Sequence, residues 1–153
     1  MQTLLVANRG EIARRVFRTC RALGIRTVAV FSDADADLPF VREADTAVHL
    51  PGSTPSETYL RGDLVVAAAL AAEADAVHPG YGFLSESAGF AQAVLDAGLT
   101  WVGPPPAAIE AMGSKLRAKE LITAAGVPCL PTWLSPAEVD AFPVLVKASA
   151  GGG

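Results

Sequence analysis

Two kinds of hydrophobic pattern alternate along residues 1–102. Short apolar runs without polar interruptions predict buried strands, and the longer segments between them carry apolar residues on one helical face. The predicted strands are 4–7, 27–31, 46–50, 74–78 and 100–102, the predicted helices are 12–23, 64–73 and 88–97, and the acidic stretch 32–38 is predicted as a loop. Since the strands are continuous apolar runs, the pattern predicts an α/β fold with a parallel sheet covered by helices on both faces.

The first predicted helix carries signals at both ends. Asn8 is predicted to cap its start, with Glu11 reaching back as in a capping box, and Gly24 is predicted to end it. The helix is expected to turn one apolar face to the core, formed by Ile12, Val16, Phe17, Cys20 and Leu23. A second face is expected to carry Arg14, Arg18 and Arg21. The arginine stripe is typical of a solvated helix face, and a subunit contact is the alternative.

The pattern changes after Pro106. A short helix is predicted over 107–112, and Ser114 is predicted to cap a further helix over 115–125. A strand is predicted over 143–149, where it runs into glycines. We therefore predict a first domain over 1–112 and the incomplete beginning of a second over 113–153.

Composition and charge exclude several classes of protein. With 51% hydrophobic and 18% charged residues, the chain has enough apolar material for a core. Its net charge of −4 and the lack of a basic run predict no nucleic-acid surface. The start has no features of a secretory leader, the longest apolar run is too short to span a membrane, and two isolated cysteines do not suggest a metal site. We expect a cytoplasmic protein that binds neither nucleic acid nor membrane.

The segments that follow the strands are the candidate ligand sites, because open parallel sheets bind ligands at the carboxyl ends of their strands. Asn8-Arg9-Gly10, with Asp33 after the next strand, matches a dinucleotide-binding turn only weakly. That fingerprint needs three glycines near the pyrophosphate, and this turn has one. A dehydrogenase is therefore not favoured.

The segment His78-Pro79-Gly80-Tyr81-Gly82-Phe83-Leu84-Ser85-Glu86 is more informative. Gly82 allows the backbone to approach a flat ligand closely, and Tyr81 can pack against such a ligand. A purely structural turn, with Phe83 and Leu84 in the core, explains the same pattern equally well.

Two lysines predict contacts with an anion. Lys115 stands in the first turn of a predicted helix, where the backbone already favours negative charge. Lys147 lies on a predicted buried strand, where its charge is costly without an anionic partner, and the glycines that follow offer bare N–H groups to phosphate oxygens. A surface lysine and a flexible linker are the respective alternatives. The order of residues is not that of a Walker loop.

Together these segments resemble biotin carboxylase, the ATP-grasp component of biotin-dependent carboxylases. The matching stretches occur in the family's order along nearly the whole chain; they are Val6 to Ala13, His78 to Glu86, Met112 to Lys115 and Val146 to Ser149. The resemblance implies a Rossmann-like parallel sheet, the pre-ATP-grasp domain, followed by the truncated start of an ATP-grasp domain.

The resemblance also implies a reaction. The family uses ATP to activate bicarbonate as carboxyphosphate and transfers the carboxyl group to a ureido nitrogen of biotin. By position, the ATP contacts would be Lys115, Lys147, Gly151, Gly152 and Gly153, the biotin-side loop Tyr81 and Gly82, and the dimer contact Arg15 and Arg18. The implied partners are a biotin carboxyl carrier domain, a carboxyltransferase subunit and a second copy. The ligands of Mg²⁺ and the catalytic base are expected beyond residue 153, so the segment alone is expected to be inactive.

Some positions depart from the family pattern. Ser114 replaces a common aspartate, the stretch 130–142 is short, and Ala22 stands where some members carry an acidic residue that could pair across the dimer. We expect the N-terminal segment of an acyl-CoA carboxylase subunit. The alternatives are another ATP-grasp ligase, a pyruvate or urea carboxylase, and a non-catalytic dimerisation or scaffold fragment.

Overall fold

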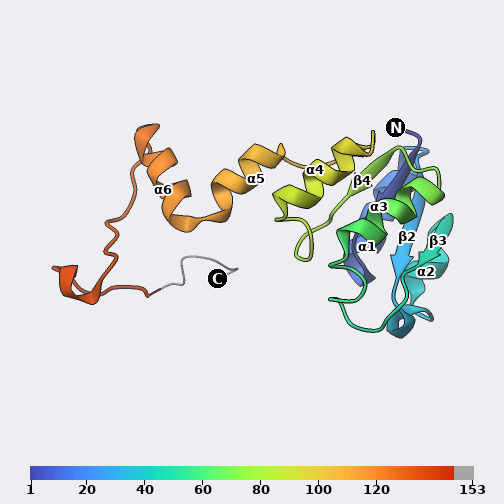
Figure 1. Ribbon diagram of the computed structural model, residues 1–153, viewed down its shortest axis with the longest axis horizontal. Coiled ribbons are helices and arrows are strands. Elements are labelled where there is room, and N and C mark those ends of the chain that lie inside the picture. Colours follow the sequence, from blue (N-terminus) through green and yellow to red (C-terminus); the bar gives the residue numbers. More distant parts are fainter. Residues whose placement is uncertain (147–153) are drawn as a thin grey trace. The chain divides into compact units, whose positions relative to one another are not determined.

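The computed structural model describes residues 1–146, which divide into a compact unit over Met1–Pro106 and a second unit that begins at Ala107 (Figure 1). The first unit alternates strands and helices. Its elements are β1 (Thr3–Val6), α1 (Gly10–Ala22), β2 (Arg26–Phe31), α2 (Pro39–Glu43), β3 (Thr46–His49), α3 (Gly62–Ala71), β4 (Ala76–His78), α4 (Ala88–Asp96) and β5 (Thr100–Trp101). The predicted domain boundary between 112 and 113 stays a prediction.

All five strands form one parallel sheet in the order β3-β2-β1-β4-β5. The chain builds outward from β1 through β2 to β3, then returns to pair β4 with the free side of β1. Leu5, at the centre, lies opposite Val28 on one neighbour and Val77 on the other. The predicted α/β fold with a Rossmann-like parallel sheet is confirmed.

The core lies on both faces of the central strand. Leu4, Leu5 and Val6 are at most 4% exposed, because helices cover both sides of β1. On α1 the buried residues are Ala13, Phe17 and Cys20, whereas Leu23, which was predicted to face the core, is exposed at the helix end. α1 packs against α2, and α3 packs against α4; right-handed crossovers place these two pairs on opposite faces.

The start of α1 differs from the prediction, and its end agrees with it. Arg9 occupies the capping position, and no side chain caps the helix. The predicted capping box of Asn8 and Glu11 is wrong, because both side chains bind the loop after β4 instead. At the other end Gly24 has φ +71°, and the amide of Ile25 donates to the carbonyl of Cys20 at 2.9 Å, which closes a Schellman turn.

The connection between β2 and β3 is more ordered than predicted. The acidic stretch 32–38 contains a 3₁₀ turn over Asp33–Asp35. The helix α2, which the pattern did not predict, begins directly after this stretch, at Pro39. Pro39 suits the first position of a helix, and Phe40 is fully buried. One buried aromatic side chain thus docks a helix too short to show periodicity.

The second unit contains α5 (Pro106–Gly113) and α6 (Lys115–Ala124). Ser114 caps α6 as predicted, since its hydroxyl accepts from the amide of Arg117 at 3.4 Å. The strand predicted over 143–149 is wrong for its described part: residues 143–146 are not a strand, and Val146 is 89% exposed. A strand needs a hydrogen-bonded neighbour, and none is found among the described residues after 106.

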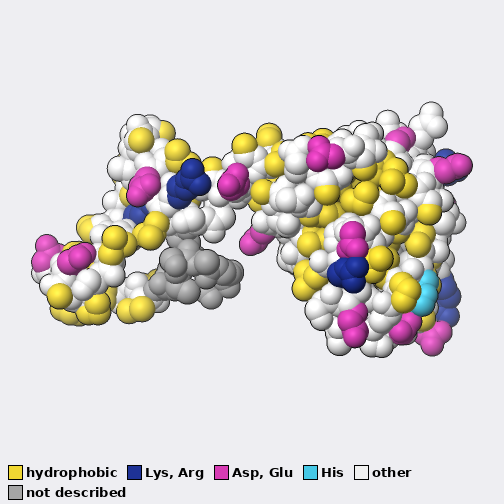
Figure 2. All heavy atoms as spheres, in the orientation of Figure 1, with side chains coloured by type: hydrophobic (Ala, Val, Ile, Leu, Met, Phe, Trp, Pro, Cys, Tyr) yellow, Lys and Arg dark blue, Asp and Glu magenta, His cyan; other side chains and the backbone are white. Residues whose placement is uncertain are grey.

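The surface carries mixed charge. On the face drawn in Figure 2, acidic side chains are scattered, and basic ones form no broad patch. Within the described part of the chain, no helix combines the length and apolarity that a bilayer crossing requires.

Candidate functional site

The candidate site lies where the strand order reverses, at the adjacent carboxyl ends of β1 and β4. The amide of Ala7, just after β1, donates to the carbonyl of His78 at 2.8 Å, so the two strand ends are fixed side by side. Open α/β sheets bind their ligands at such a switch point. The segments that meet there begin at Asn8 and Pro79.

Asn8 joins these two segments. Its side chain is buried, and its Nδ2 donates to the carbonyls of Pro79 and Tyr81, each at 2.9 Å. Its Oδ1 accepts from the amide of Arg9 at 3.0 Å. Both ends of the amide are therefore satisfied, and the bond to Tyr81 spans 73 residues of sequence. Sequence reasoning assigned Asn8 to a local cap and missed this role.

Gly80 permits the close approach of the two segments. With φ +68°, it adopts a left-handed conformation, and a Cβ there would stand 2.7 Å from Nδ2 of Asn8 and 2.8 Å from Cγ2 of Ile12. Its amide donates to Nδ1 of His78 at 2.9 Å. Burial lowers the pKa of His78, so its imidazole is neutral at physiological pH, with Nδ1 as the acceptor.

Tyr81 and Gly82 form the exposed tip of the loop. Tyr81 is 58% exposed, and its hydroxyl donates to Oε1 of Glu11 at 2.5 Å. This hydrogen bond raises the pKa of Tyr81. Gly82 has φ +67°, and a Cβ there would meet nothing within 4 Å. Its backbone is therefore open to a flat molecule that lies beside the Tyr81 ring.

A shallow depression of about 380 Å³ runs along this tip. It is lined mainly by apolar surface, from Asn8, Arg9, Gly10, Glu11, Ile12, Tyr81, Gly82 and Phe83. The structure thus brings the start of α1 and the loop after β4 together. Such a wall suits an apolar, planar ligand better than a highly charged one.

Phe83 rests on a buried aromatic residue. Its ring stacks on Tyr59 with the ring centroids 5.2 Å apart and the planes at 4°. The guanidinium carbon of Arg9 lies 5.5 Å from the Tyr59 ring and 5.6 Å from the Phe83 ring, within the range of cation–π attraction. Leu84 is buried as well. The loop therefore combines a packed half with an exposed half. The binding of a flat ligand by Tyr81 and Gly82 stays a prediction.

Asp35 is the polar centre behind this stack. Its carboxylate accepts from the Tyr59 hydroxyl at 2.6 Å, from the Ser32 hydroxyl at 2.9 Å and from Nη1 of Arg9 at 3.1 Å. Burial by itself would raise the pKa of Asp35, but these hydrogen bonds outweigh it and hold that pKa below its usual value. Burial and the bond to Asp35 raise the pKa of Tyr59 to about 12. Neither residue stands in a recognisable motif, so sequence reasoning missed both.

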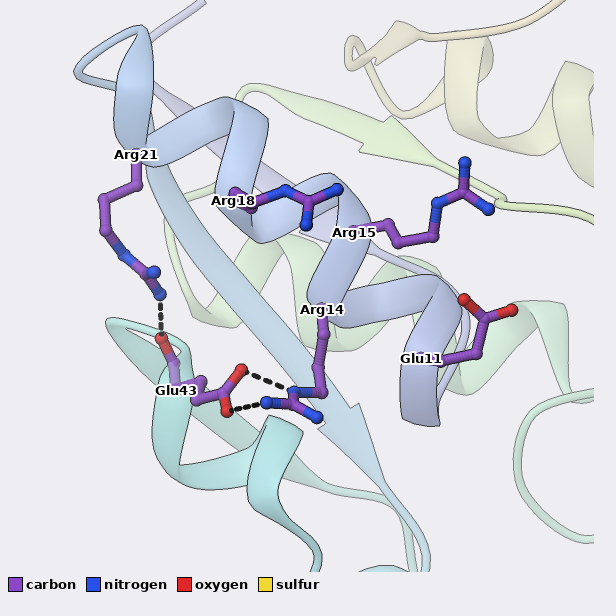
Figure 3. A pocket seen from close by; sticks show the side chains of 6 residues that line it. All are labelled: Glu11, Arg14, Arg15, Arg18, Arg21 and Glu43. Atoms are coloured by element: carbon purple, nitrogen blue, oxygen red, sulfur yellow. Dashed lines mark hydrogen bonds and ion pairs between the residues drawn. The ribbon is translucent and has the colours of Figure 1, made fainter.

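A second hollow, of about 510 Å³, follows the arginine face of α1 (Figure 3). Arg14 pairs with Glu43 at 2.8 Å, and Nη2 of Arg21 donates to the Glu43 carbonyl at 3.1 Å. Arg15 and Arg18 project from the same helix, and within residues 1–146 neither forms an ion pair. Two of the arginines thus fix α2 to α1, and the predicted role of Arg15 and Arg18 in a dimer contact stays a prediction.

The residues predicted to bind phosphates lie largely outside the part of the chain that the structure describes. Lys115 is the first residue of α6, and its side chain lies outside the described part of the chain. Lys147, Gly151, Gly152 and Gly153 also lie outside the described residues. Within the described part, no group of three or more His, Cys, Asp or Glu side chains could hold a metal ion.

Comparison with known proteins identifies the sequence relatives. Residues 1–109 match the family model described as the N-terminal domain of biotin carboxylase. The alpha subunit of mitochondrial methylcrotonoyl-CoA carboxylase from Oryza sativa is 51% identical over all of this chain, which covers 22% of that protein. A biotin carboxylase from Halalkalibacterium halodurans is 46% identical over 98% of the chain and 35% of its own length.

A solved structure agrees along nearly the full chain. The biotin carboxylase domain of 2-oxoglutarate carboxylase from Hydrogenobacter thermophilus, solved with MgADP, ADP and bicarbonate, aligns with a TM-score of 0.90 and 43% identity. The alignment covers 99% of this chain and 36% of that one. The chain therefore spans about a third or less of the length of these relatives.

Proposed function

Because the chain belongs to the biotin carboxylase family, we propose that it is the N-terminal segment of a subunit that carboxylates biotin at the expense of ATP. Bicarbonate and ATP give carboxyphosphate and ADP, and the carboxyl group then passes to a ureido nitrogen of biotin on a carrier domain. The observation that carries this proposal is the loop after β4, which Asn8 holds at the switch point with Tyr81 and Gly82 open beside the depression.

The fit to biotin rests on shape and polarity. The apolar thioether ring of biotin's fused bicycle suits a depression with little polar surface. The Tyr81 ring offers a flat side, and Gly82 offers backbone without a side chain. In this proposal Tyr81 and Gly82 bind and orient the biotin ring, and they take no part in proton transfer.

The ATP contacts are proposed for the second unit. Lys115 and Lys147 would offset phosphate charge, which grows on the transferred group during reaction, and Gly151 to Gly153 would begin a loop over the triphosphate. Ser114 supports this assignment, because its cap fixes the start of α6, where a helix favours anions. Mg²⁺ would neutralise the phosphates when bound. Its ligands are expected in the part of the relatives' length that this chain does not span.

The partners follow from the proposed reaction. Carboxybiotin must reach an acceptor, so we propose a biotin carboxyl carrier domain and a carboxyltransferase subunit, with an acyl-CoA as the acceptor. Arg15 and Arg18 are proposed as a contact between two copies, since their guanidinium groups are left over on the arginine face of α1 (Figure 3). We propose a cytoplasmic location.

An ATP hydrolysis assay on a chain extended by the remaining biotin carboxylase domains tests this function. We expect turnover that requires bicarbonate and increases with free biotin, whereas the 153-residue chain alone should be inactive. Bicarbonate-dependent turnover that ignores biotin would instead indicate another ATP-grasp ligase. An extended chain that binds no ATP would indicate a dimerisation or scaffold role.

A further inference from the structure

The exposed tip of the loop after β4 lies between two anchored residues. Before the tip, the carbonyl of Tyr81 is held by Asn8 at 2.9 Å. After it, Phe83 packs on Tyr59 with nearly parallel rings. Gly82 stands between these anchors, and a Cβ there would meet nothing within 4 Å. Its position is set by its two neighbours and by the hydrogen bond that its carbonyl accepts from the amide of Ser85 at 2.9 Å.

Phe83, the second anchor, has an unfavourable backbone conformation. Phe83 has φ +42°, one of two non-glycine residues with positive φ in the described chain. Bulky residues avoid this region, and they persist there only where the surroundings determine the conformation. The Tyr59 ring, which stacks on Phe83, and the Arg9 guanidinium supply that surrounding surface. Loss of the stacked ring would favour a return of Phe83 to negative φ and a rotation of the peptide that joins it to Gly82.

Tyr59 is itself held rigidly. It is 1% exposed, its hydroxyl donates to Asp35 at 2.6 Å, and the same hydroxyl accepts from the amide of Ser32 at 3.1 Å. Nη1 of Arg9 also donates to Asp35, at 3.1 Å. The Tyr59 ring is thus tied to the segments that follow β1 and β2, and these two strands are neighbours in the central sheet.

We propose that Tyr59 is a positioning residue: its buried ring holds Phe83 in the left-handed conformation and so places Gly82 and Tyr81 for the flat substrate. This inference rests on the proposed function, in which that substrate is biotin. Tyr59 does not line the depression, so it acts through Phe83 and does not touch the substrate.

Kinetics of the extended enzyme test the proposal with three variants. Tyr59→Leu removes the stacking ring, Tyr59→Phe keeps the ring without its hydroxyl, and Phe17→Leu removes a fully buried ring from the α1 core as a matched control. We expect Tyr59→Leu to raise the KM for free biotin about tenfold, because small misplacements of a binding group are costly. The KM for ATP should stay at the parent value. Tyr59→Phe should keep the KM for biotin at the parent value. Phe17→Leu should lower stability without changing either KM.

Hydrogen exchange on the 153-residue chain gives a readout that needs no activity. The amide of Ser85 donates to the carbonyl of Gly82 at 2.9 Å, so its exchange reports whether the tip keeps its conformation. We expect faster exchange at Ser85 in Tyr59→Leu, with the amides of β1 and β2 still protected. An unchanged exchange rate at Ser85 would overturn the claim that Tyr59 anchors the loop.

The two proposals fail in different ways. If the extended parent shows no biotin-dependent turnover, the proposed function fails, and the exchange rate still decides whether Tyr59 holds the loop. If the parent turns over biotin, but Tyr59→Leu leaves its KM unchanged or raises both KM values equally, the positioning role is overturned.

Discussion

Single side chains build the candidate site, and most of them act far from their sequence neighbours. Asn8 is of a residue type that commonly caps helices, yet its amide donates to two carbonyls of the loop after β4, those of Pro79 and Tyr81. Gly82 and Tyr81 could be predicted from their local pattern. Asp35 and Tyr59 could not, because their partners are brought close only by the completed sheet.

At Gly80 we predict a large cost of adding one methyl group. Gly80 and Gly82 have φ +68° and +67°, so alanine is strained equally at both. Only at Gly80 would the new Cβ stand within 3 Å of other side chains. We expect Gly80→Ala to lower the free energy of unfolding by about 3 kcal/mol, from strain and overpacking. Gly82→Ala should cost about 1 kcal/mol, from strain alone. Urea unfolding of both variants measures the difference, and equal losses would contradict the crowding at Gly80.

At Asp35 we predict a pH-dependent contribution to stability. The pKa of Asp35 is lower in the folded chain than in the unfolded chain, so the unfolded state takes up the proton first as pH falls. The stabilisation is complete above the unfolded value of about 4 and is lost as pH falls through the lower folded pKa. Asp35→Asn should therefore be less stable than the parent at neutral pH, with the gap closing in acid. Thermal unfolding across this range measures the gap, and a gap independent of pH would refute the prediction.

At the scale of elements, the sequence pattern predicts what depends on local periodicity and misses what depends on a partner. All five strands of the sheet and the helices α1, α3 and α4 fall within the predicted segments to within a few residues. α2 was missed, because a five-residue helix shows no period and depends on burying Phe40. The strand over 143–149 was predicted from an apolar run, but its described part has no neighbouring strand.

Alanine substitutions of Gly24, at the end of α1, and of Gly89, in α4, should change the free energy of unfolding in opposite directions. Gly24 adopts φ +71° in the Schellman turn, whereas Gly89 lies inside α4 with ordinary helical backbone, and both have free space around them. Gly24→Ala should lower the free energy of unfolding by about 1 kcal/mol. Gly89→Ala should raise it by about 0.5 kcal/mol, since alanine favours helix. Denaturant titration gives both values; a loss at Gly89 would contradict the space found there.

At the scale of the whole molecule, the two units differ in how far their apolar side chains are buried. The first unit has a closed core and a candidate site built from its own residues. The described part of the second unit has the two α-helices α5 and α6, and apolar side chains such as Leu130 and Leu145 are largely exposed. This chain spans about a third or less of the length of the relatives it matches.

The proposed phosphate contact can be tested only in that larger context. In an extended chain, Lys147→Ala should raise the KM for ATP more than tenfold, because a charge-assisted phosphate contact is worth about 1.5–3 kcal/mol. The KM for biotin should change little. Steady-state kinetics with each substrate varied in turn makes the comparison. Equal ATP KM values in variant and parent would remove Lys147 from the nucleotide site.

The placement of β1 at the centre of the sheet has a consequence for synthesis of the chain. β1 leaves the ribosome before the other strands of this sheet. It receives one neighbour soon, when β2 follows, but must wait for its other neighbour until β4 has been made. During that interval an apolar strand edge is open to pairing with other chains. The bond from Asn8 to Tyr81, which spans 73 residues, can form only when this interval ends. We therefore expect ribosome-bound chains arrested before β4 to depend on chaperones, and that dependence to fall once residue 83 has emerged.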